Sequence, residues 1–229
     1  VGLAREMLEA AAKDGAEEVE KRHLEWWANY WNRGYVTIDD EDAERGWYRA
    51  LYICGACLRA GKHSPGLQGA WIKEHLPAWR ADYHANLNIQ ATYWSCFTAN
   101  RLELVEPLLA FYLNALPRCQ RDTREFFQMD GSYLPHSCDI FGNPTGNATV
   151  LPLLASMSPA CWLASMFWDY FDYSGDRDYL RDWGYPLLRE VTRFSEDYLS
   201  FDKDRGTIEP SICWEVNTGS MEGWGRNSQ

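Results

Sequence analysis

The sequence predicts an all-α protein whose helices are joined by long loops. Apolar residues recur at helical spacing, most clearly from Tyr93 to Ala115, where successive apolar positions are 4, 7, 4, 3 and 4 residues apart. Segments 61–86 and 130–158 are rich in Gly and Pro and interrupt this pattern. No stretch of alternating polar and apolar residues is long enough for a major sheet. These three observations favour the all-α class.

The first half of the chain predicts two helices followed by a loop. Residues 3–31 are rich in Ala, Glu, Leu and Trp and predict a helix that Gly15 weakens. The acidic cluster 39–42 precedes an apolar-periodic stretch that runs to residue 60. Acidic side chains suit the positive end of a helix, so we interpret this cluster as a cap and first turn, with a metal-binding motif as the alternative. Segment 61–86 then predicts a long structured loop, and such loops are usually functional.

The second half predicts paired helices around another long loop. The helix that begins near residue 88 is expected to kink or restart at Pro107. After loop 130–158, a helix runs from 159 to 173, and Ser174-Gly175-Asp176 supplies its stop and the cap of the next helix. Residues 202–206 hint at a calcium loop, but the Gly and Glu that this loop needs are out of register, so we expect a turn. Helical periodicity alone does not decide between a bundle and a toroid.

Composition narrows the class of protein. The chain has 229 residues, of which 46% are hydrophobic and 24% charged, as in globular proteins. A net charge of -11 opposes nucleic-acid binding, because there is no basic surplus to displace counterions. No run of about 18 apolar residues is present, so no membrane partner is expected. Twelve Trp residues in an aromatic content of 15% exceed what a core needs and suggest an aromatic-lined cleft.

The seven cysteines predict neither a disulfide scaffold nor a metal centre. They lack the dense spacing of small secreted domains, and most are expected to be buried thiols. Cys54 and Cys57 form a CxxC that no second CxxC or His pair completes, so we interpret them as core residues. No cofactor and no metal are predicted. The chain begins at Val1 and ends in a Gly, Ser and Asn stretch, and we expect residues 1–229 to be one partial catalytic domain.

The densest polar and aromatic cluster lies at residues 79–94. A packed core tolerates such a run badly, because each buried Asn, Asp, Gln or His needs hydrogen-bond partners. Asn86 and Asn88 stand at the mouth of the following helix. Their amides can accept a hydrogen bond from a water molecule and donate one to a sugar hydroxyl. The alternative is that one or both are helix N-caps, and the residues alone leave both possibilities open.

This cluster resembles the catalytic-domain signature of glycoside hydrolase family 95. The resemblance spans roughly residues 20–217 and rests on several motifs in the same order, namely Gln68-Gly69-Ala70-Trp71, Pro77-Ala78-Trp79, Asp82-Tyr83-His84-Ala85-Asn86-Leu87-Asn88-Ile89-Gln90, Tyr93-Trp94, Glu106-Pro107-Leu108, His136-Ser137-Cys138-Asp139-Ile140-Phe141-Gly142, the segment from Trp162 to Tyr173, and Pro210-Ser211-Ile212-Cys213-Trp214-Glu215. Members of that family are inverting α-L-fucosidases and α-L-galactosidases on an (α/α)6 barrel. The resemblance therefore implies an incomplete (α/α)6 barrel, since a full twelve-helix barrel needs about twice this length.

The resemblance also implies catalytic roles. Glu215 matches the family's general acid, and desolvation beside Trp214 would raise its pKa and keep a proton available. The family's Ser-Pro-Glu-Asn is replaced by Cys213-Trp214-Glu215-Val216-Asn217 in this chain, and Glu209 is a nearby competitor for the role. Asn86 and Asn88 match the pair that positions the attacking water. In the family, the carboxylate that polarises these amides lies downstream of the acid, and this chain has no counterpart.

Six further residues are candidates for sugar contact. The resemblance favours imidazole contacts to sugar hydroxyls, and indole rings can stack on the apolar faces of sugars. The alternatives are hydrogen-bonded structural histidines and core aromatics. The candidates are His84, His136, Trp71, Trp79, Trp94 and Asp139.

The functional prediction is a fragment of an inverting exo-glycoside hydrolase that acts on α-L-fucosides or related sugars. Its expected partner is an oligosaccharide or glycoside, and the isolated fragment is expected to be inactive. A non-catalytic carbohydrate-binding module and a clan relative, such as a phosphorylase or another glycosidase, are the alternatives. The resemblance favours a secreted or periplasmic location.

Overall fold

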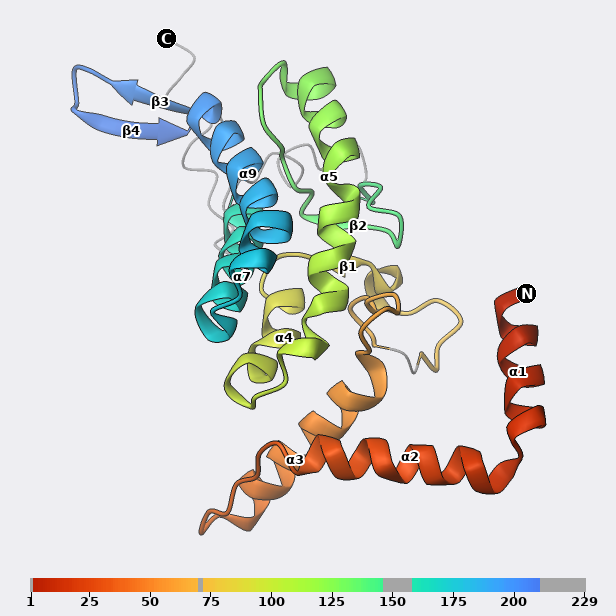
Figure 1. Cartoon of the computed structure of the whole chain (residues 1–229). Coiled ribbons are helices and arrows are strands. Elements are labelled where there is room, and N and C mark those ends of the chain that lie inside the picture. The colour runs from red at the N-terminus through yellow and green to blue at the C-terminus, as the bar shows by residue number, and fades with distance from the viewer. Residues whose placement is uncertain (1, 70–71, 146–157, 211–229) are drawn as a thin grey trace. The chain divides into compact units, whose positions relative to one another are not determined.

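The chain forms two compact units, Val1–Gly55 and Ala56–Gln229, and each is described by itself. The computed structural model describes residues 2–69, 72–145 and 158–210 (Figure 1). The described residues are mostly helical, as predicted, and their strands form two small two-stranded sheets. The expectation of one partial catalytic domain over residues 1–229 stays a prediction.

The first unit holds α1 (Gly2–Asp14), α2 (Ala16–Trp31) and most of α3 (Glu41–Cys57). The single helix predicted over residues 3–31 is wrong in one respect, because the chain breaks at Gly15. That residue has φ 81°, a left-handed conformation that glycine adopts without steric cost. The hydroxyl of Tyr30 donates to the carbonyl of Leu51 at 2.7 Å, which ties α2 to α3.

The acidic cluster before α3 is a helix cap, as predicted. Oδ1 of Asp40 accepts hydrogen bonds from the backbone N–H groups of Asp42 at 3.1 Å and Ala43 at 3.0 Å. These are two of the N–H groups that a helix leaves without partners at its N-terminus. Glu41 and Asp42 follow in the first turn, where negative charge opposes the positive end of the helix dipole.

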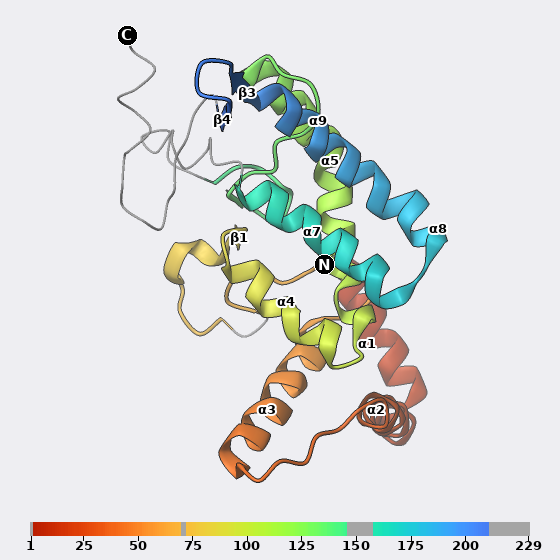
Figure 2. The same ribbon diagram turned by 90° about the vertical axis from the view of Figure 1, so that its left-hand side faces the viewer.

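The second unit is built from longer helices that pack around an apolar core. Its longer helices are α4 (Asn88–Thr98), α5 (Glu106–Phe127), α7 (Ser158–Ser174) and α9 (Tyr185–Tyr198), with the short helices η1 (Ala78–Ala81), η2 (Leu102–Leu104), α8 (Arg177–Tyr179) and the π-helical η4 (Leu180–Gly184). Helix α7 packs against both α4 and α9, and α5 runs beside α9 (Figures 1 and 2). The core between them includes the buried side chains of Leu104, Leu108, Leu163, Phe167, Leu187 and Phe194.

Local sequence sets where these helices begin and end. The predicted restart at Pro107 is confirmed, because α4 ends at Thr98 and α5 begins at Glu106 with Pro107 in its first turn. Proline suits that position because the first N–H groups of a helix have no intrahelical partner. The predicted helix over residues 159–173 is confirmed as α7.

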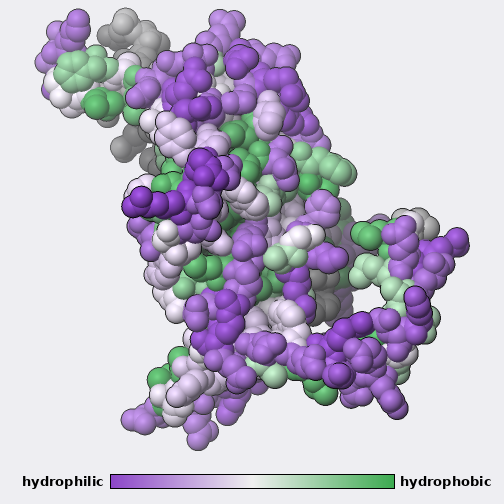
Figure 3. Space-filling view, viewed as in Figure 1, coloured by the Kyte–Doolittle hydropathy of each residue, from purple (hydrophilic) through white to green (hydrophobic). Residues whose placement is uncertain are grey.

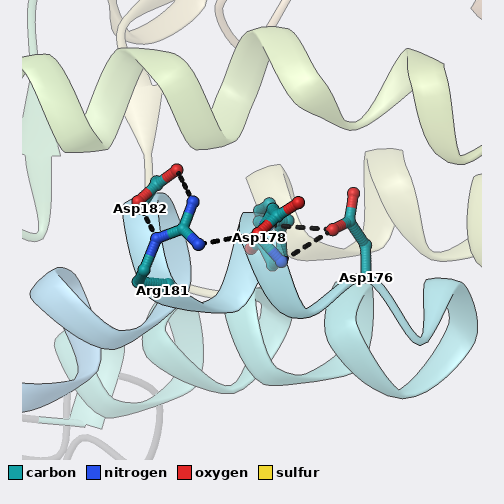
Figure 4. A network of polar contacts seen from close by, with 5 residues as sticks. Asp176, Asp178, Arg181 and Asp182 are labelled. Carbon is teal, nitrogen blue, oxygen red and sulfur yellow. Dashed lines mark hydrogen bonds and ion pairs between the residues drawn. The ribbon is translucent and has the colours of Figure 1, made fainter.

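A capped turn joins α7 to α8, as predicted (Figure 4). Gly175 follows α7 with φ 65°, and Oδ1 of Asp176 accepts from the N–H groups of Asp178 at 2.9 Å and Tyr179 at 3.0 Å. The guanidinium of Arg181 lies 2.7 Å from carboxylate oxygens of both Asp178 and Asp182. These pairs are exposed, so they add little to stability, and the cap defines the turn.

The two small sheets are antiparallel pairs of short strands, of which the second is a hairpin. Strand β1 (Tyr83–His84) pairs with β2 (Ser137–Cys138), and β3 (Leu199–Asp202) pairs with β4 (Thr207–Pro210). Oδ1 of Asp202 accepts from the N–H groups of Asp204 and Arg205, which confirms the predicted turn. The sequence did not predict the strands that flank it.

The surface and the thiols agree with a globular protein. Hydrophilic side chains cover much of α5 and α9 on the face shown in Figure 3, and hydrophobic surface shows between the two helices. In the described ranges, no helix is both long and apolar enough to cross a bilayer. Cys54, Cys96, Cys119 and Cys138 are buried thiols, as expected, whereas Cys161 is exposed. Cys213 lies outside the described residues.

We predict that Gly131→Ala strongly destabilises the second unit. Gly131 has φ 80°, and a Cβ atom at this position would lie 2.2 Å from the backbone N of Phe194 and 2.4 Å from the carbonyl O of Glu190. A left-handed alanine and a clash with helix backbone together cost at least about 3 kcal/mol. Urea unfolding of the purified protein measures this loss.

Gly175→Ala is the matched control. Gly175 also has a positive φ of 65°, but nothing lies within 4 Å of its Cβ position. Its substitution should cost only about 1 kcal/mol, from backbone strain alone. Equal losses for the two variants would contradict the predicted close packing of Gly131 on α9.

Candidate functional site

The β1–β2 contact joins the two long loops that the sequence predicts to be functional. Residues Tyr83 and Cys138 are paired, as are His84 and Ser137. One residue further on, the N–H of Ala85 donates to the carbonyl of His136 at 2.7 Å. Side chains more than fifty residues apart in the sequence therefore meet beside this short ladder.

Two imidazoles meet at the ladder. Nε2 of His84 lies 3.0 Å from Nε2 of His136, and the ring planes are perpendicular at a centroid distance of 4.6 Å. Nδ1 of His84 faces Oδ1 of Asp82 at 3.4 Å. The indole of Trp79 stacks on the His84 ring at 4.5 Å with an interplanar angle of 24°. Nε2 and one face of His84 are thus engaged by protein groups, and Nδ1 faces the Asp82 carboxylate without forming a hydrogen bond within the described residues.

Burial sets the protonation state of His136. This side chain is 3% exposed, and its pKa is lowered to about 4, mainly by loss of hydration; the neighbouring His84 adds to the shift and Asp82 opposes it. His136 is therefore neutral at pH 7. In the His84 tautomer whose Nδ1 proton faces the Asp82 carboxylate, Nε2 of His84 is the acceptor of this bond. In this arrangement, the Nε2–H of His136 is the donor.

Asp82 connects the pair to the surrounding loops. The hydroxyl oxygen of Thr145 lies 3.3 Å from Oδ2 of Asp82 and 3.1 Å from Oγ of Ser137. The N–H of Leu67 donates to the carbonyl of Asp82 at 2.9 Å. Gly66 permits this approach, since a Cβ atom there would lie 2.2 Å from the carbonyl oxygen of Ala81. Asp82 is 9% exposed, so these contacts place a carboxylate in a largely dry setting.

The segment that carries Asn86 and Asn88 is held on both sides. The buried side chain of Gln90 donates from Nε2 to the carbonyl of Ala85 at 2.6 Å. Leu87, between the two asparagines, has φ 68° and occupies the N-cap position of α4. The alternative that Asn86 or Asn88 is the N-cap residue is therefore wrong. Both side chains are half-buried.

Hydrogen bonds of two tyrosine hydroxyls to Ser64 hold loop 61–86 beside the segment that carries the asparagines. The hydroxyl of Tyr83 donates to the carbonyl of Ser64, and Oγ of Ser64 lies 2.6 Å from the hydroxyl of Tyr93. Burial is the main cause that raises the pKa of Tyr83 to about 12, so this phenol stays protonated. These bonds tie loop 61–86 to α4.

The turn before β1 stores backbone strain. Trp79, Arg80 and Ala81 have φ values of 51°, 58° and 54°. A left-handed conformation costs roughly 1–2 kcal/mol for each residue other than glycine. Strain of this kind persists where the surroundings fix the conformation, and it is common at functional sites.

The structure brings several predicted site residues together and separates others. Trp79, His84, Asn86, Asn88 and His136 gather around the β1–β2 contact. Trp94 lies on α4 and its ring packs 5.6 Å from that of Trp162.

Asp139 closes its own turn. Its carboxylate accepts from the N–H groups of Phe141 and Asn143 and from the amide of Asn143. Burial alone would raise the pKa of Asp139, but these hydrogen bonds outweigh burial and lower it. Trp71 and Glu215 lie outside the described residues. Glu209, the competitor for the acid, lies on β4 opposite Ser200.

Sequence reasoning missed the roles of Asp82 and Thr145. Asp82 stands within the polar cluster, two residues before His84, which on a strand places both side chains on one face. That period-2 spacing was a usable signal. Nothing in the sequence pairs Thr145 with Asp82, because their contact depends on the β1–β2 register.

A separate cavity of about 290 Å³ lies between α5, α7 and the α8–η4 segment. Its lining is acidic and aromatic and comprises Glu106, Tyr170, Asp176, Asp178, Tyr179, Asp182 and Trp183. The Tyr170 hydroxyl donates to Glu106 at 3.1 Å, and the Asp side chains serve the cap and the ion pairs of Figure 4. Over the described ranges, no group of three or more His, Cys, Asp or Glu side chains is arranged to hold a metal ion.

Comparisons with known proteins identify relatives. The Glycosyl hydrolase family 95 catalytic domain matches residues 43–223. "Probable alpha-fucosidase A" of Aspergillus niger is 32% identical over 170 residues, which are 72% of this chain and 21% of that protein. "Alpha-L-fucosidase 2" of Arabidopsis thaliana is 29% identical over 154 residues, which are 67% of this chain and 18% of that protein.

Phosphorylases are more distant relatives. "Alpha,alpha-trehalose phosphorylase" of Thermoanaerobacter brockii is 24% identical over 97% of this chain and 27% of that protein. Among solved structures, a "Putative kojibiose phosphorylase from human microbiome" has a TM-score of 0.73 at 14% identity and covers 90% of this chain and 30% of its own. This last similarity concerns the fold alone, and it confirms the predicted all-α class and the incomplete (α/α)6 barrel.

The chain matches only a small part of each relative's length. The chain spans 30% or less of each of these four proteins. The family match, by contrast, extends over well more than half of the chain and includes the segment with both asparagines and both histidines. We conclude that the chain belongs to glycosyl hydrolase family 95.

Proposed function

We propose that the complete protein hydrolyses α-L-fucosides or closely related glycosides with inversion at the anomeric carbon. Family membership and the two relatives named as fucosidases support this substrate class. The structural observation that carries the proposal is the held segment 85–90. Leu87, and not either asparagine, occupies the N-cap position of α4, and the backbone beside them is fixed by His136 and Gln90.

In the proposed mechanism, Glu215 protonates the glycosidic oxygen while a water molecule attacks the opposite face of the sugar. Asn86 and Asn88 accept hydrogen bonds from that water and orient it. A neutral amide is too weak a base to remove a proton by itself, so a carboxylate must complete the activation. Inverting enzymes need space for a water between acid and base, which places the two groups roughly 6.5–9.5 Å apart.

Exposed aromatic rings are the proposed contacts to the sugar. Trp79 is 60% exposed although one face of its indole rests on His84, so the opposite face is available for the apolar side of a pyranose. We propose Trp71, Trp94, His84, His136 and Asp139 as further members of the binding region. Of these, His136 is buried and therefore acts from behind His84.

A phosphorylase is the second candidate function. The trehalose phosphorylase aligns over almost the entire chain, and the kojibiose phosphorylase shares its fold. In such an enzyme, inorganic phosphate would replace the attacking water. A non-catalytic sugar-binding module would instead keep the aromatic surface and lack turnover.

We predict that Glu215→Gln in the complete protein lowers kcat on an alkyl α-L-fucoside by about 10²–10⁴, because the leaving group loses its proton donor. KM should change little. Steady-state kinetics measures both constants. Glu209→Gln is the control, because it removes a carboxyl group from β4 that the proposal leaves without a role.

Two outcomes would contradict the assignment. A loss of activity in Glu209→Gln and not in Glu215→Gln would exchange the roles of the two carboxyl groups. Sugar binding that Glu215→Gln does not affect, in a complete protein without turnover, would favour the non-catalytic module.

We predict that Asn86→Ala and Asn88→Ala each lower kcat by about 10²–10³, because each removes one fixed polar contact to the attacking water. Asn114→Ala is the control, since Asn114 is an exposed residue of α5.

The first anomer released, observed by proton NMR, tests inversion. Release of the α-anomer would contradict the mechanism.

We predict that turnover does not depend on inorganic phosphate. Hydrolysis uses water as the nucleophile, so the rate of L-fucose release should be the same in phosphate-free buffer and in millimolar phosphate. Product analysis should show free fucose. A sugar phosphate as the main product would instead establish the phosphorylase.

A further inference from the structure

His136 is a buried imidazole whose hydrogen bonds only partly offset the free-energy cost of its burial. Its ring is 3% exposed, and within the described ranges its Nδ1 atom has no hydrogen-bond partner. Burying such a group costs free energy unless its polar atoms are satisfied. Among the described residues, the hydrogen bond that the ring makes is the 3.0 Å bond between its Nε2 and Nε2 of His84.

That bond completes the support of His84. His136 bonds Nε2 of the His84 ring, and the Asp82 carboxylate lies 3.4 Å from Nδ1 without hydrogen-bond geometry, so the hydrogen bond that the imidazole would break on rotating is the one to His136. The His84 ring lies nearly parallel to the indole of Trp79. The orientation of that indole therefore depends on a chain of contacts that begins at His136.

The backbone of Trp79 makes this support necessary. Trp79, Arg80 and Ala81 all have left-handed conformations, which relax unless their surroundings hold them. In the described part of the chain, the aromatic ring that packs on the indole of Trp79 is that of His84. The opposite face of the indole is open, since the side chain is 60% exposed.

We propose that His136 is a positioning residue that donates its Nε2 proton to His84 and so holds Trp79 as a fixed platform for one sugar ring. The sugar in this statement rests on the proposed function, whereas the link from His136 to Trp79 does not. His136 acts through His84 and does not touch the substrate. Because the platform contacts the bound sugar before and during reaction alike, its loss should raise KM and leave kcat nearly unchanged.

Three variants of the complete protein test the kinetic effect. His136→Leu removes the donor and should raise KM for an α-L-fucoside about tenfold with kcat within about twofold. His136→Gln retains an N–H donor and should restore KM to within about threefold of the wild type. His75→Leu is the matched control at an exposed loop histidine and should leave both constants unchanged.

A second readout does not require any activity. The emission of Trp79 is obtained as the difference between each protein and its partner that also carries Trp79→Phe. His136→Leu should shift this difference emission to longer wavelength, because the released indole meets more water, and His136→Gln should not. If the complete protein proves not to be a hydrolase, this measurement still tests the link from His136 to Trp79.

Acid unfolding tests the protonation state that the donor role requires. The groups that act on His136 are His84 on β1 and Asp82 just before it. Burial also raises the pKa of the nearby Cys138 thiol and Tyr133 phenol, so both stay neutral. The pKa of His136 is about 4 in the folded protein, against about 6.5 when unfolded, so the unfolded chain takes up this proton first.

Wild-type stability should therefore fall as pH decreases from about 6.5 to about 4. The urea midpoint should decrease less over this range in His136→Gln than in the wild type. The same pH dependence in both proteins would overturn the assignment of His136 as a neutral buried donor.

His84→Phe keeps the experiment decisive if His136→Leu does not fold. This variant retains an aromatic ring under Trp79 but removes both nitrogens, so the Trp79 emission should change as predicted for His136→Leu. If both fold, the double variant should have the Trp79 emission of either single variant, because the two residues act in series. Unchanged KM and Trp79 emission in His136→Leu, or a fall in kcat at constant KM, would overturn the proposal.

Discussion

The short antiparallel contact between β1 and β2 is the constraint on which the candidate site depends. It pairs Tyr83 with Cys138 and His84 with Ser137, and the bond from Ala85 to the carbonyl of His136 extends it. A ladder this short contributes little stability by itself. Its importance is geometric, because a shift of one residue would turn His84 to the other face and separate it from His136.

Packing around the ladder explains how so few hydrogen bonds hold a register. Tyr83 stacks on Phe111 of α5 at 4.1 Å, and Cys138 is 1% exposed. Gln90 reaches back from α4 to the carbonyl of Ala85. The helices thus form a rigid frame, and the two loops place the polar groups on it. This division is common where binding residues lie on loops that a scaffold positions.

Local signals in the sequence were enough to predict several helix ends. The acidic cluster 39–42 and Asp176 were recognisable as caps, and Pro107 as a helix start, because each effect acts within one turn. The break at Gly15 was only partly foreseen, since glycine in a helix is a cost and not a stop. The strands β1 to β4 were missed because their pairing is set by tertiary contacts that no local pattern encodes.

The sequence and its family resemblance name candidate site residues, but they do not predict how these residues are connected. Asn86, Asn88, His84 and His136 were selected in this way, and their roles stay predictions. Two contacts could be identified only from the structure. They are the hydrogen bond between the two imidazoles and the contact of Thr145 with Asp82. The left-handed turn at Trp79 to Ala81 lay beyond prediction as well, because these residues do not favour that conformation and neighbouring contacts impose it.

The most direct test of the account is a crystal structure of the complete protein with L-fucose bound. The account predicts that the Glu215 carboxyl group and the amides of Asn86 and Asn88 lie on opposite sides of the anomeric carbon, with room for one water on the amide side. A sugar bound elsewhere, or Glu215 and the two amides on separate faces of the protein, would contradict it.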